Sequence, residues 1–373
     1  MSAAYEAGAA SDAADRIELL DLTRGAAEEL VQRLGYKAFH GRNLFKWIHK
    51  HGLTEPEAMT DLPKALRHRL LDSGRVTPPR IVDESPAPDG TIKWLLEVGG
   101  DQHIETVLIP DSGRQTLCVS TQVGCALECA FCATGRQGFN RNLRVSEIIG
   151  QVWHATRHLG RPPTNVVLMG MGEPLANFEA VVAALEIMQD DLSYMLSKYR
   201  VTVSTSGIVP NIYRLAAASD VSLAVSLHAP TNALRDELVP INRKYPLEQL
   251  LPACKAYLRG ERRRQITWEY VMLDGVNDGP REAKQLIGLL EGIPSKVNLI
   301  PYNPFADCAF RTPAAERVES FRQRLLRSGL VATTRKTRGE TIAAACGQLV
   351  GRVATRARHM DPPPRDASHP AQP

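Results

Sequence analysis

The chain has 373 residues, 43% of them hydrophobic and 23% charged, with a formal net charge of +4. This length allows roughly two or three domains with a substantial core, and the composition excludes a disordered, collagenous or coiled-coil protein. No run of about 18 apolar residues is free of charge, which excludes a membrane-spanning helix. Residues 1–15 lack the basic segment and apolar run of a signal peptide, so we expect a cytoplasmic protein that does not bind membranes.

Residues 16–78 have the pattern of three short helices. Thr23 is predicted to cap the first helix, and the second covers residues 43–51. Asp61 is predicted to cap the third helix, with Pro63 in its first turn. Helices of this size make a small accessory domain, which is too small to be the catalytic body.

Strand patterns follow these helices. Residues 91–98 and 103–109, joined by Gly99 and Gly100, are predicted to form a hairpin. Apolar, β-branched runs then lie near 115–120, 164–169, 200–205, 221–227, 265–272 and 296–301. Helical patterns lie near 145–159, 178–190, 208–217, 246–259, 280–291 and 313–328. Six strands that each precede a helix require parallel pairing, which predicts an α/β fold: an open doubly wound sheet or a complete or partial (β/α) barrel, with a further strand at 331–336.

Unusual residues gather just after the predicted strands. Five of the six strand ends carry Gly, Cys, His, Glu or Asn, in the segments 125–135, 170–174, 204–207, 226–228 and 301–304. Parallel βα folds build their active sites from the loops that leave the carboxyl ends of the strands. We therefore expect the active site at one open end of the sheet.

Cys125, Cys129 and Cys132 form the spacing C-x3-C-x2-C in the first of these loops. Thiolates this close on one loop can reach three corners of a compact metal centre. A structural zinc site needs four ligands, and Cys118, in the preceding strand, points elsewhere. An iron–sulfur cube normally takes four cysteines, so three would leave one iron open to a small molecule. Zinc binding and buried free thiols are the alternatives.

This motif resembles the one with which radical S-adenosylmethionine enzymes hold a [4Fe-4S] cluster. Gly170-Met-Gly-Glu173-Pro174 resembles the glycine-rich motif with which these enzymes meet the methionine amino group. Further segments are similar to the adenine-C2 methyltransferases of large-subunit ribosomal RNA, namely Gln122-Val-Gly, Phe131-Cys-Ala-Thr-Gly, Ser204-Thr-Ser-Gly, Ser226-Leu-His, Asn298-Leu-Ile-Pro, Ala345-Cys-Gly-Gln and Gly41-Arg-Asn-Leu-Phe-Lys-Trp47. The resemblance covers about residues 16–355.

The resemblance implies a partial (β/α)6 radical-SAM barrel with a small N-terminal all-helical accessory domain. It implies a [4Fe-4S] cluster, two molecules of S-adenosylmethionine per turnover, 23S rRNA and tRNA as substrates, and an electron donor such as flavodoxin. We expect a monomer. The predicted parts are a disordered N-terminus (1–15), an RNA-binding helical domain (16–78), a β-hairpin extension (79–114), the barrel (115–336), a C-terminal segment carrying the methyl-accepting cysteine (337–360) and a disordered tail (361–373).

Radical chemistry suits adenine C2, because this electron-poor carbon is a bad nucleophile for ordinary methyl transfer. By resemblance, Cys346 takes a methyl group from one S-adenosylmethionine, and a 5′-deoxyadenosyl radical made from a second removes a hydrogen from it. The methylene radical adds to C2, Glu105 accepts the C2 proton, and Cys118 releases the product by forming a disulfide. Without the resemblance, Cys118 and Cys346 would be read as packing residues, as Cys254 and Cys308 are.

The residues expected to bind S-adenosylmethionine lie in the strand-end motifs. Some are small polar groups suited to the ribose, carboxylate or adenine edges of this molecule. The predicted set is Gly172, Glu173, Ser204, Ser226, Leu227, His228 and Asn303.

Charge supports an RNA substrate. Between Arg311 and Arg358 there are 11 basic residues against 3 acidic ones, and a second basic cluster lies at 262–264. With the basic residues of the accessory domain, these could flank the barrel mouth and hold RNA through its phosphates. Solvated helix faces are the plain alternative.

Three other functions stay open. The related methyltransferase that acts on adenine C8 of the same RNA, and confers antibiotic resistance, shares the cluster motif and both working cysteines. A radical enzyme for a peptide or small molecule would leave Cys118 and Cys346 without a purpose. A non-catalytic zinc-binding protein associated with RNA would be colourless, whereas a cluster protein purified without oxygen is brown.

Overall fold

The structure is a computed structural model that describes residues 16–258, 264–305 and 308–351. The predicted disordered ends (1–15 and 361–373), Arg262 and Arg263 lie outside the described residues. Within the described part of the chain, no helix is both long and apolar enough to cross a membrane.

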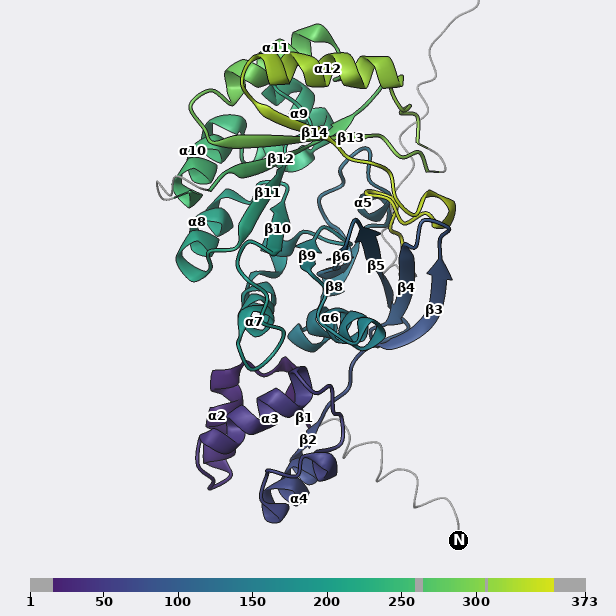
Figure 1. Cartoon of the computed structure of the whole chain (residues 1–373). Helices are drawn as coiled ribbons and strands as arrows, with labels where there is room; N and C mark the ends of the chain where they lie inside the picture. The colour runs from purple at the N-terminus through teal and green to yellow at the C-terminus, as the bar shows by residue number, and fades with distance from the viewer. Residues whose placement is uncertain (1–15, 259–263, 306–307, 352–373) are drawn as a thin grey trace, which may run out of the picture.

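One ten-stranded sheet forms the body of the protein, in the order β14-β13-β12-β11-β10-β9-β6-β5-β4-β3 (Figure 1). Its parallel strands are β6 (Arg114–Cys118), β9 (Asn165–Leu168), β10 (Val201–Thr205), β11 (Ser222–Ser226), β12 (Ile266–Met272), β13 (Ser295–Pro301) and β14 (Val331–Thr334). The two outermost strands, β14 and β3, do not pair with each other, so the sheet is open. This confirms the prediction of a partial barrel.

A helix follows each of the first six parallel strands, as predicted. These helices are α6 (Val145–Leu159), α7 (Phe178–Gln189), α8 (Val209–Ala218), α10 (Leu247–Tyr257), α11 (Pro280–Leu289) and α12 (Ala315–Arg327). The sequence did not predict the short helices inside the loops, which are α5 (Ala133–Gln137), η3 (Pro174–Asn177), α9 (Asn232–Leu238) and η4 (Pro240–Arg243). Apolar residues of the helices and of the sheet between them form one continuous core.

Three antiparallel strands extend the sheet beyond β6. The predicted hairpin is confirmed as β4 (Ile92–Glu97) and β5 (His103–Asp111), and β5 also pairs with β6. An additional edge strand, β3 (Arg80–Pro86), pairs with β4. The sequence analysis missed β3 because none of its seven residues is buried and it lacks the apolar alternation of a half-buried strand.

The N-terminal region consists of β1 (Ile17–Glu18), η1 (Leu19–Asp21), α2 (Arg24–Arg33), α3 (Phe39–His49), η2 (Pro56–Ala58), α4 (Lys64–Ser73) and β2 (Gly74–Arg75). The predicted cap at Thr23 is confirmed, since its side chain accepts a hydrogen bond from the Ala26 N–H. The predicted cap at Asp61 is wrong. Pro63 precedes α4 without a side-chain cap, while Asp61 accepts a hydrogen bond from the Trp47 indole.

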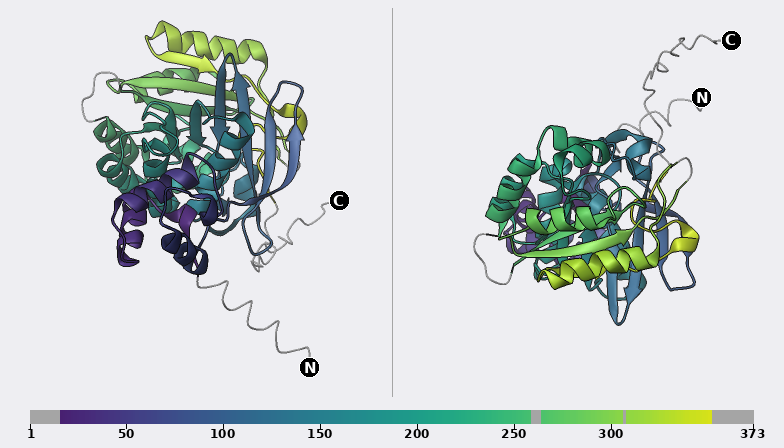
Figure 2. Two further views of the ribbon diagram at one scale, coloured as in Figure 1. Left: turned by 60° about the horizontal axis from the view of Figure 1, so that its bottom comes forward. Right: turned by 90° about the horizontal axis from the view of Figure 1, so that it is seen from above.

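The N-terminal helices pack against α6 and α7, at the opposite end of the molecule from α11 and α12 (Figures 1 and 2). The Ser146 N–H, in the first turn of α6, donates to Asp21 Oδ1 at 2.6 Å. The Arg24 guanidinium pairs with Asp190 at 3.1 Å, just after α7. Apolar residues of the N-terminal helices belong to the same core as those of the sheet, so the two regions form one body.

Candidate active site

A cavity opens at the carboxyl ends of the parallel strands and encloses about 1000 Å³, its open mouth included. Every parallel strand from β9 to β14, or the loop after it, contributes to its wall. Of the predicted site residues, the wall includes Cys125, Cys129, Cys132, Gly172, Glu173, Ser204, Ser226, His228 and Cys346. Cys118, Glu105, Leu227 and Asn303 are not in this wall.

The cysteine loop is fixed by backbone hydrogen bonds to three distant segments. The Cys125 N–H donates to Gly138 O at 2.8 Å, the Ala130 N–H to Leu238 O at 3.1 Å, and the Ala133 N–H to Gly347 O at 2.8 Å. Burial raises the pKa of the Cys125 thiol to about 12 and that of Cys129 well above its usual value. Thiols in such a place ionise readily only when a cation binds them.

Within residues 16–258, 264–305 and 308–351, no group of three or more His, Cys, Asp or Glu side chains is arranged to hold one metal ion. The three cysteines nevertheless face the same cavity, and electrostatic interactions link all three thiols. Thiolates that hold an iron–sulfur cube sit at different corners of it, further apart than the ligands of a single zinc ion. The donor set therefore fits a cluster better than a mononuclear zinc site.

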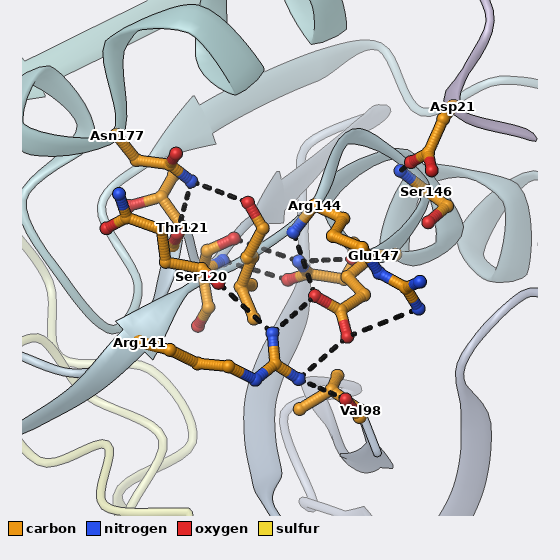
Figure 3. Close-up of polar contacts among 12 residues, drawn as sticks. Asp21, Val98, Ser120, Thr121, Arg141, Arg144, Ser146, Glu147 and Asn177 are labelled. Carbon is orange, nitrogen blue, oxygen red and sulfur yellow. Dashed lines mark hydrogen bonds and ion pairs between the residues drawn. The ribbon is translucent and has the colours of Figure 1, made fainter. Parts of the chain in front are cut away.

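A ribbon of two short strands, β7 (Gln122–Gly124) and β8 (Phe139–Asn142), flanks the cysteine loop. Figure 3 shows how the structure holds this ribbon: the Arg141 guanidinium of β8 donates to both carboxylate oxygens of Glu147, each at 2.8 Å, and also to Val98 O. The Asn177 amide donates to Thr121 O at 2.9 Å and to Leu143 O on the far side of the ribbon. The loop that carries the cysteines is thus anchored to α6 and to the start of α7.

The segment after β9 passes close to the ribbon, and only glycine fits there. A Cβ atom on Gly172, which has φ +95°, would lie 2.5 Å from Gln122 Cβ, and one on Gly170 would lie 2.6 Å from Ser120 Oγ. Glu173 is buried, and its carboxylate accepts hydrogen bonds from Ser206 N at 2.8 Å and Leu175 N at 3.0 Å. Burial raises the pKa of Glu173, and these hydrogen bonds oppose the rise.

His228 lies in the cavity wall with a left-handed backbone (φ +59°). Its Nδ1 accepts a hydrogen bond from the Val271 N–H at 2.9 Å, so the ring proton is on Nε2. Burial lowers the pKa of His228 to about 3, which keeps the ring neutral. Leu227 beside it is fully buried in the core and acts through its backbone: its N–H donates to Glu269 O at 3.0 Å, and its carbonyl oxygen accepts from Arg235 at 3.1 Å.

Arg235 is a site residue that the sequence analysis missed. It lies on α9, is fully buried, and donates to Leu227 O at 3.1 Å, Ser206 O at 2.6 Å and Ser226 O at 3.1 Å. Burial lowers the pKa of Arg235 to about 10. This single guanidinium ties the loops after β10 and β11 together, so it positions the small polar groups of the cavity wall. An arginine in a short helix gives no local signal of such a role.

Cys346 and Cys118 lie close enough to interact electrostatically, although they are far apart in the sequence. Burial raises the pKa of the Cys118 thiol to about 12, and the nearness of Cys346 adds to the rise. Burial also raises the pKa of Cys346, while Arg335 opposes this through its charge and a side-chain hydrogen bond. Cys346 is in turn the main cause of a raised pKa of Arg335. The two proposed working cysteines thus share one arginine, which follows β14 and which the sequence analysis did not single out.

Glu269 on β12 is the carboxylate next to Cys346 and Arg335, and the sequence analysis also missed it. It lines the cavity, accepts a hydrogen bond from Asn298 Nδ2 at 2.7 Å, and interacts with both Arg335 and Cys346. Burial raises the pKa of Glu269, and Arg335 opposes this rise. The buried cation Arg335 therefore lowers the pKa of Cys346, and the buried carboxylate Glu269 raises it.

Glu105 lies on β5 outside the cavity. One of its carboxylate oxygens pairs with Lys93 at 2.9 Å, and the other accepts a hydrogen bond from the Val350 N–H at 3.0 Å. Asn303 is also outside the main cavity, in a second one beside it, where its amide donates to Cys346 O at 3.4 Å. Both residues thus contact the C-terminal segment that carries Cys346.

Comparison with known proteins identifies the family. Residues 119–287 match the model of the radical SAM superfamily, and residues 17–76 match that of the ribosomal RNA large subunit methyltransferase N-terminal domain. The dual-specificity RNA methyltransferase RlmN of Alkalilimnicola ehrlichii is 56% identical over 347 residues, which is 92% of this chain and 96% of the relative. The chain belongs to the RlmN family.

Other members of the RlmN family agree with this assignment. That of Francisella tularensis subsp. mediasiatica is 51% identical over 348 residues, covering 91% of this chain and 94% of the relative. A crystal structure of a radical SAM methyltransferase from Sphaerobacter thermophilus superimposes with a TM-score of 0.84 at 46% identity, covering 89% of this chain and 99% of that one. The chain is therefore a radical SAM RNA methyltransferase with the radical SAM fold, and its family implies S-adenosylmethionine and a [4Fe-4S] cluster.

Proposed function

We propose that this enzyme methylates C2 of an adenine in 23S rRNA and in tRNA, using two molecules of S-adenosylmethionine per methyl group and an S-methylated Cys346 as intermediate. The observation that carries the proposal is that Cys346 and the C-x3-C-x2-C cysteines line one cavity, and that Cys118, just outside it, interacts with Cys346. A simple S-adenosylmethionine-cleaving enzyme has no use for the two additional thiols. An enzyme that carries a methyl group on one thiol and releases it with another needs both.

Cys125, Cys129 and Cys132 would hold the [4Fe-4S] cluster, which when bound supplies the electron that breaks the sulfonium bond of S-adenosylmethionine. The remaining predicted residues of the wall, Gly172, Glu173, Ser204, Ser226 and His228, surround the same space and would bind that molecule. Leu227 contributes through its backbone, where the carbonyl holds Arg235. Asn303 would act at a distance, by holding the backbone of Cys346.

Cys346 accepts the methyl group as a thiolate: an S–C bond forms on its sulfur, the donor's own bond to that carbon breaks, and S-adenosylhomocysteine leaves. The Arg335 guanidinium stabilises the negative charge of this thiolate. After one hydrogen atom has been removed from the methyl group, the sulfur-bound carbon adds to adenine C2, which joins Cys346 to the RNA.

Glu105 takes the C2 proton in this scheme, and the unpaired electron of the adduct leaves to a one-electron acceptor, a role that the bound cluster would fill. The Cys118 thiolate then attacks the Cys346 sulfur: an S–S bond forms, the S–CH2 bond breaks, and the electron pair stays on the carbon, which takes up a proton and becomes the methyl group. An external donor such as flavodoxin would supply the electron that the cluster needs, and two electrons and two protons from a thiol reductant restore both cysteines. The nearness of Cys118 to Cys346 supports this release step.

We further propose the predicted division of labour along the chain. Residues 16–78 would bind RNA, residues 79–114 extend the sheet, residues 115–336 form the barrel, and residues 337–360 carry the methyl-accepting cysteine. The match of residues 17–76 to a methyltransferase N-terminal domain supports the first assignment. We propose that the enzyme works as a monomer in the cytoplasm.

The experiment is mass spectrometry of 23S rRNA and tRNA after reaction with the purified, reduced enzyme. Methyl on adenine C2 is expected in both, and a C8 product would assign the chain to the resistance enzymes instead. Iron and sulfide should each be present at about four per chain after oxygen-free purification, as one cube requires. Stoichiometric zinc would overturn the proposal.

A further inference from the structure

A second, smaller cavity, which encloses about 390 Å³ with its open mouth included, lies on the other side of Cys346. Cys346, Arg335 and Ile300 line both cavities, so these residues form the wall between them. The rest of the second cavity is strongly basic, with Lys336 and Arg338 from the turn after β14, and none of its lining residues is acidic. The main cavity, by contrast, includes Glu173 and Glu269.

The turn that carries these cations is held in place. The Thr337 hydroxyl donates to Asn303 Oδ1 at 3.2 Å, and the Gly339 N–H donates to Asp89 Oδ2 at 3.1 Å. Arg338 pairs with Asp111 at 3.1 Å, but the two side chains are 31% and 57% exposed. Exposed pairs of this kind stabilise a protein little, so Arg338 can exchange Asp111 for a stronger anion.

We propose that this second cavity binds one backbone phosphate of the RNA next to the target adenosine, through Lys336 and Arg338. The proposal rests on the proposed function. Paired Lys and Arg side chains are the usual protein ligands of RNA phosphates, and the cavity that they line has room for a phosphate group. S-adenosylmethionine has no phosphate, so the site serves the RNA.

A phosphate bound in the second cavity would position the RNA relative to Cys346. Phosphate contacts set the register of a nucleic acid on a protein, while base contacts read its sequence. A phosphate held on one side of Cys346 brings the base of its own nucleotide within reach of the Cys346 sulfur on the wall. Methyl transfer through a bond between Cys346 and C2 needs such placement, because the sulfur-bound carbon must meet one ring atom.

The test is the double variant K336Q/R338Q in the reconstituted holoenzyme. Methylation of Cys346 by S-adenosylmethionine without RNA, followed by mass of the intact protein, should equal that of the wild type. With RNA, kcat/KM should fall about five- to tenfold or more, the loss expected for a charge-assisted contact, mainly through KM. The slope of log affinity against log salt should fall by about one. The matched control R281Q/K284Q removes the same charge from exposed positions on α11. It should change neither kcat/KM nor the salt slope.

A neutral methylphosphonate, placed singly at each linkage around the target adenosine, identifies the phosphate. At one linkage, the substitution should lower kcat/KM of the wild type and leave kcat/KM of K336Q/R338Q unchanged. Equal losses in both proteins at every linkage, or an unchanged kcat/KM and salt slope in the variant, would overturn the inference. If instead the wild type methylates no adenosine at all, the proposed function fails, and the two failures are distinct.

Discussion

The carboxylate of Glu105 accepts a hydrogen bond at 3.0 Å from the backbone N–H of Val350, 245 positions further along the chain. Its other oxygen pairs with Lys93, whose ammonium also donates to Ala343 O at 3.5 Å. The residue proposed as proton acceptor therefore also fastens the segment that carries Cys346 to the edge of the sheet. The segment lies beside β4 and β5 in Figure 1.

Two substitutions separate these roles of Glu105. Glu105→Gln keeps an oxygen that can accept from Val350 and removes the base, so we expect slow release of the RNA adduct with a well-anchored segment. Glu105→Ala removes both the base and the hydrogen-bond acceptor. Loss of this buried contact should destabilise the anchored segment by about 1–3 kcal/mol and therefore speed hydrogen exchange in residues 340–351. Gel analysis of the adduct and exchange mass spectrometry measure the two effects. Fast turnover by Glu105→Gln would exclude Glu105 as the proton acceptor.

Arg335 controls the ionisation of Cys346. Since Arg335 opposes the burial that raises the pKa of Cys346, Arg335→Gln should raise this pKa further and leave less thiolate at any given pH. Alkylation of Cys346 by iodoacetamide should slow about tenfold per unit of added pKa, with its pH profile moved upward. Arg335→Lys should retain part of the effect.

Glu269→Gln is the matched control for Arg335→Gln. Because Glu269 raises the pKa of Cys346, its removal should move the pH profile of alkylation to lower pH. Shifts of opposite sign in the two variants would show that charge, and not packing, sets the reactivity. Identical profiles in wild type and Arg335→Gln would contradict the prediction.

Cys118→Ala should trap the RNA on Cys346, because no second thiol can attack the joining sulfur. Cys346→Ala should abolish methylation while leaving cleavage of S-adenosylmethionine possible. Cys254→Ala removes a buried cysteine of α10 outside the cavity and should turn over normally. Denaturing gels with labelled RNA distinguish the three, and a Cys118→Ala enzyme that forms no adduct would remove Cys118 from the release step.

His49 makes the protein sensitive to acid. Burial lowers its pKa from 6.5 to about 3, and its ring lies edge-on to Tyr194, between the N-terminal helices and the barrel. The unfolded chain therefore binds a proton that the folded chain does not, and stability falls as the pH drops from 6.5 towards 3, by up to about 1.4 kcal/mol per unit. His49→Phe should flatten urea unfolding free energies over this range. An equally steep dependence in the variant would assign the sensitivity to other groups.

The sequence by itself determined the order of strands and helices and the loop that carries the candidate cluster cysteines. Alternating strand and helix patterns from residue 115 onward predicted the parallel sheet, because their periods are local and repeat often. The spacing of Cys125, Cys129 and Cys132 fixed three thiols on one loop, and the order of strands dictated that the loop opens where the other motifs gather. These are short-range signals, so they survive without knowledge of packing.

Only the tertiary structure decided which residues surround the reacting sulfurs. Arg335 follows a short edge strand, Glu269 lies within a buried one and Arg235 on a seven-residue helix, and none has a neighbour in sequence that reveals its role. Their partners are brought close by strand order and by the C-terminal segment returning over the sheet. The same reason accounts for Asp61, which bonds Trp47 instead of its own helix, and for Glu105, whose partner Val350 is far along the chain. Contacts between distant segments depend on how the whole chain packs, and local patterns carry no record of that.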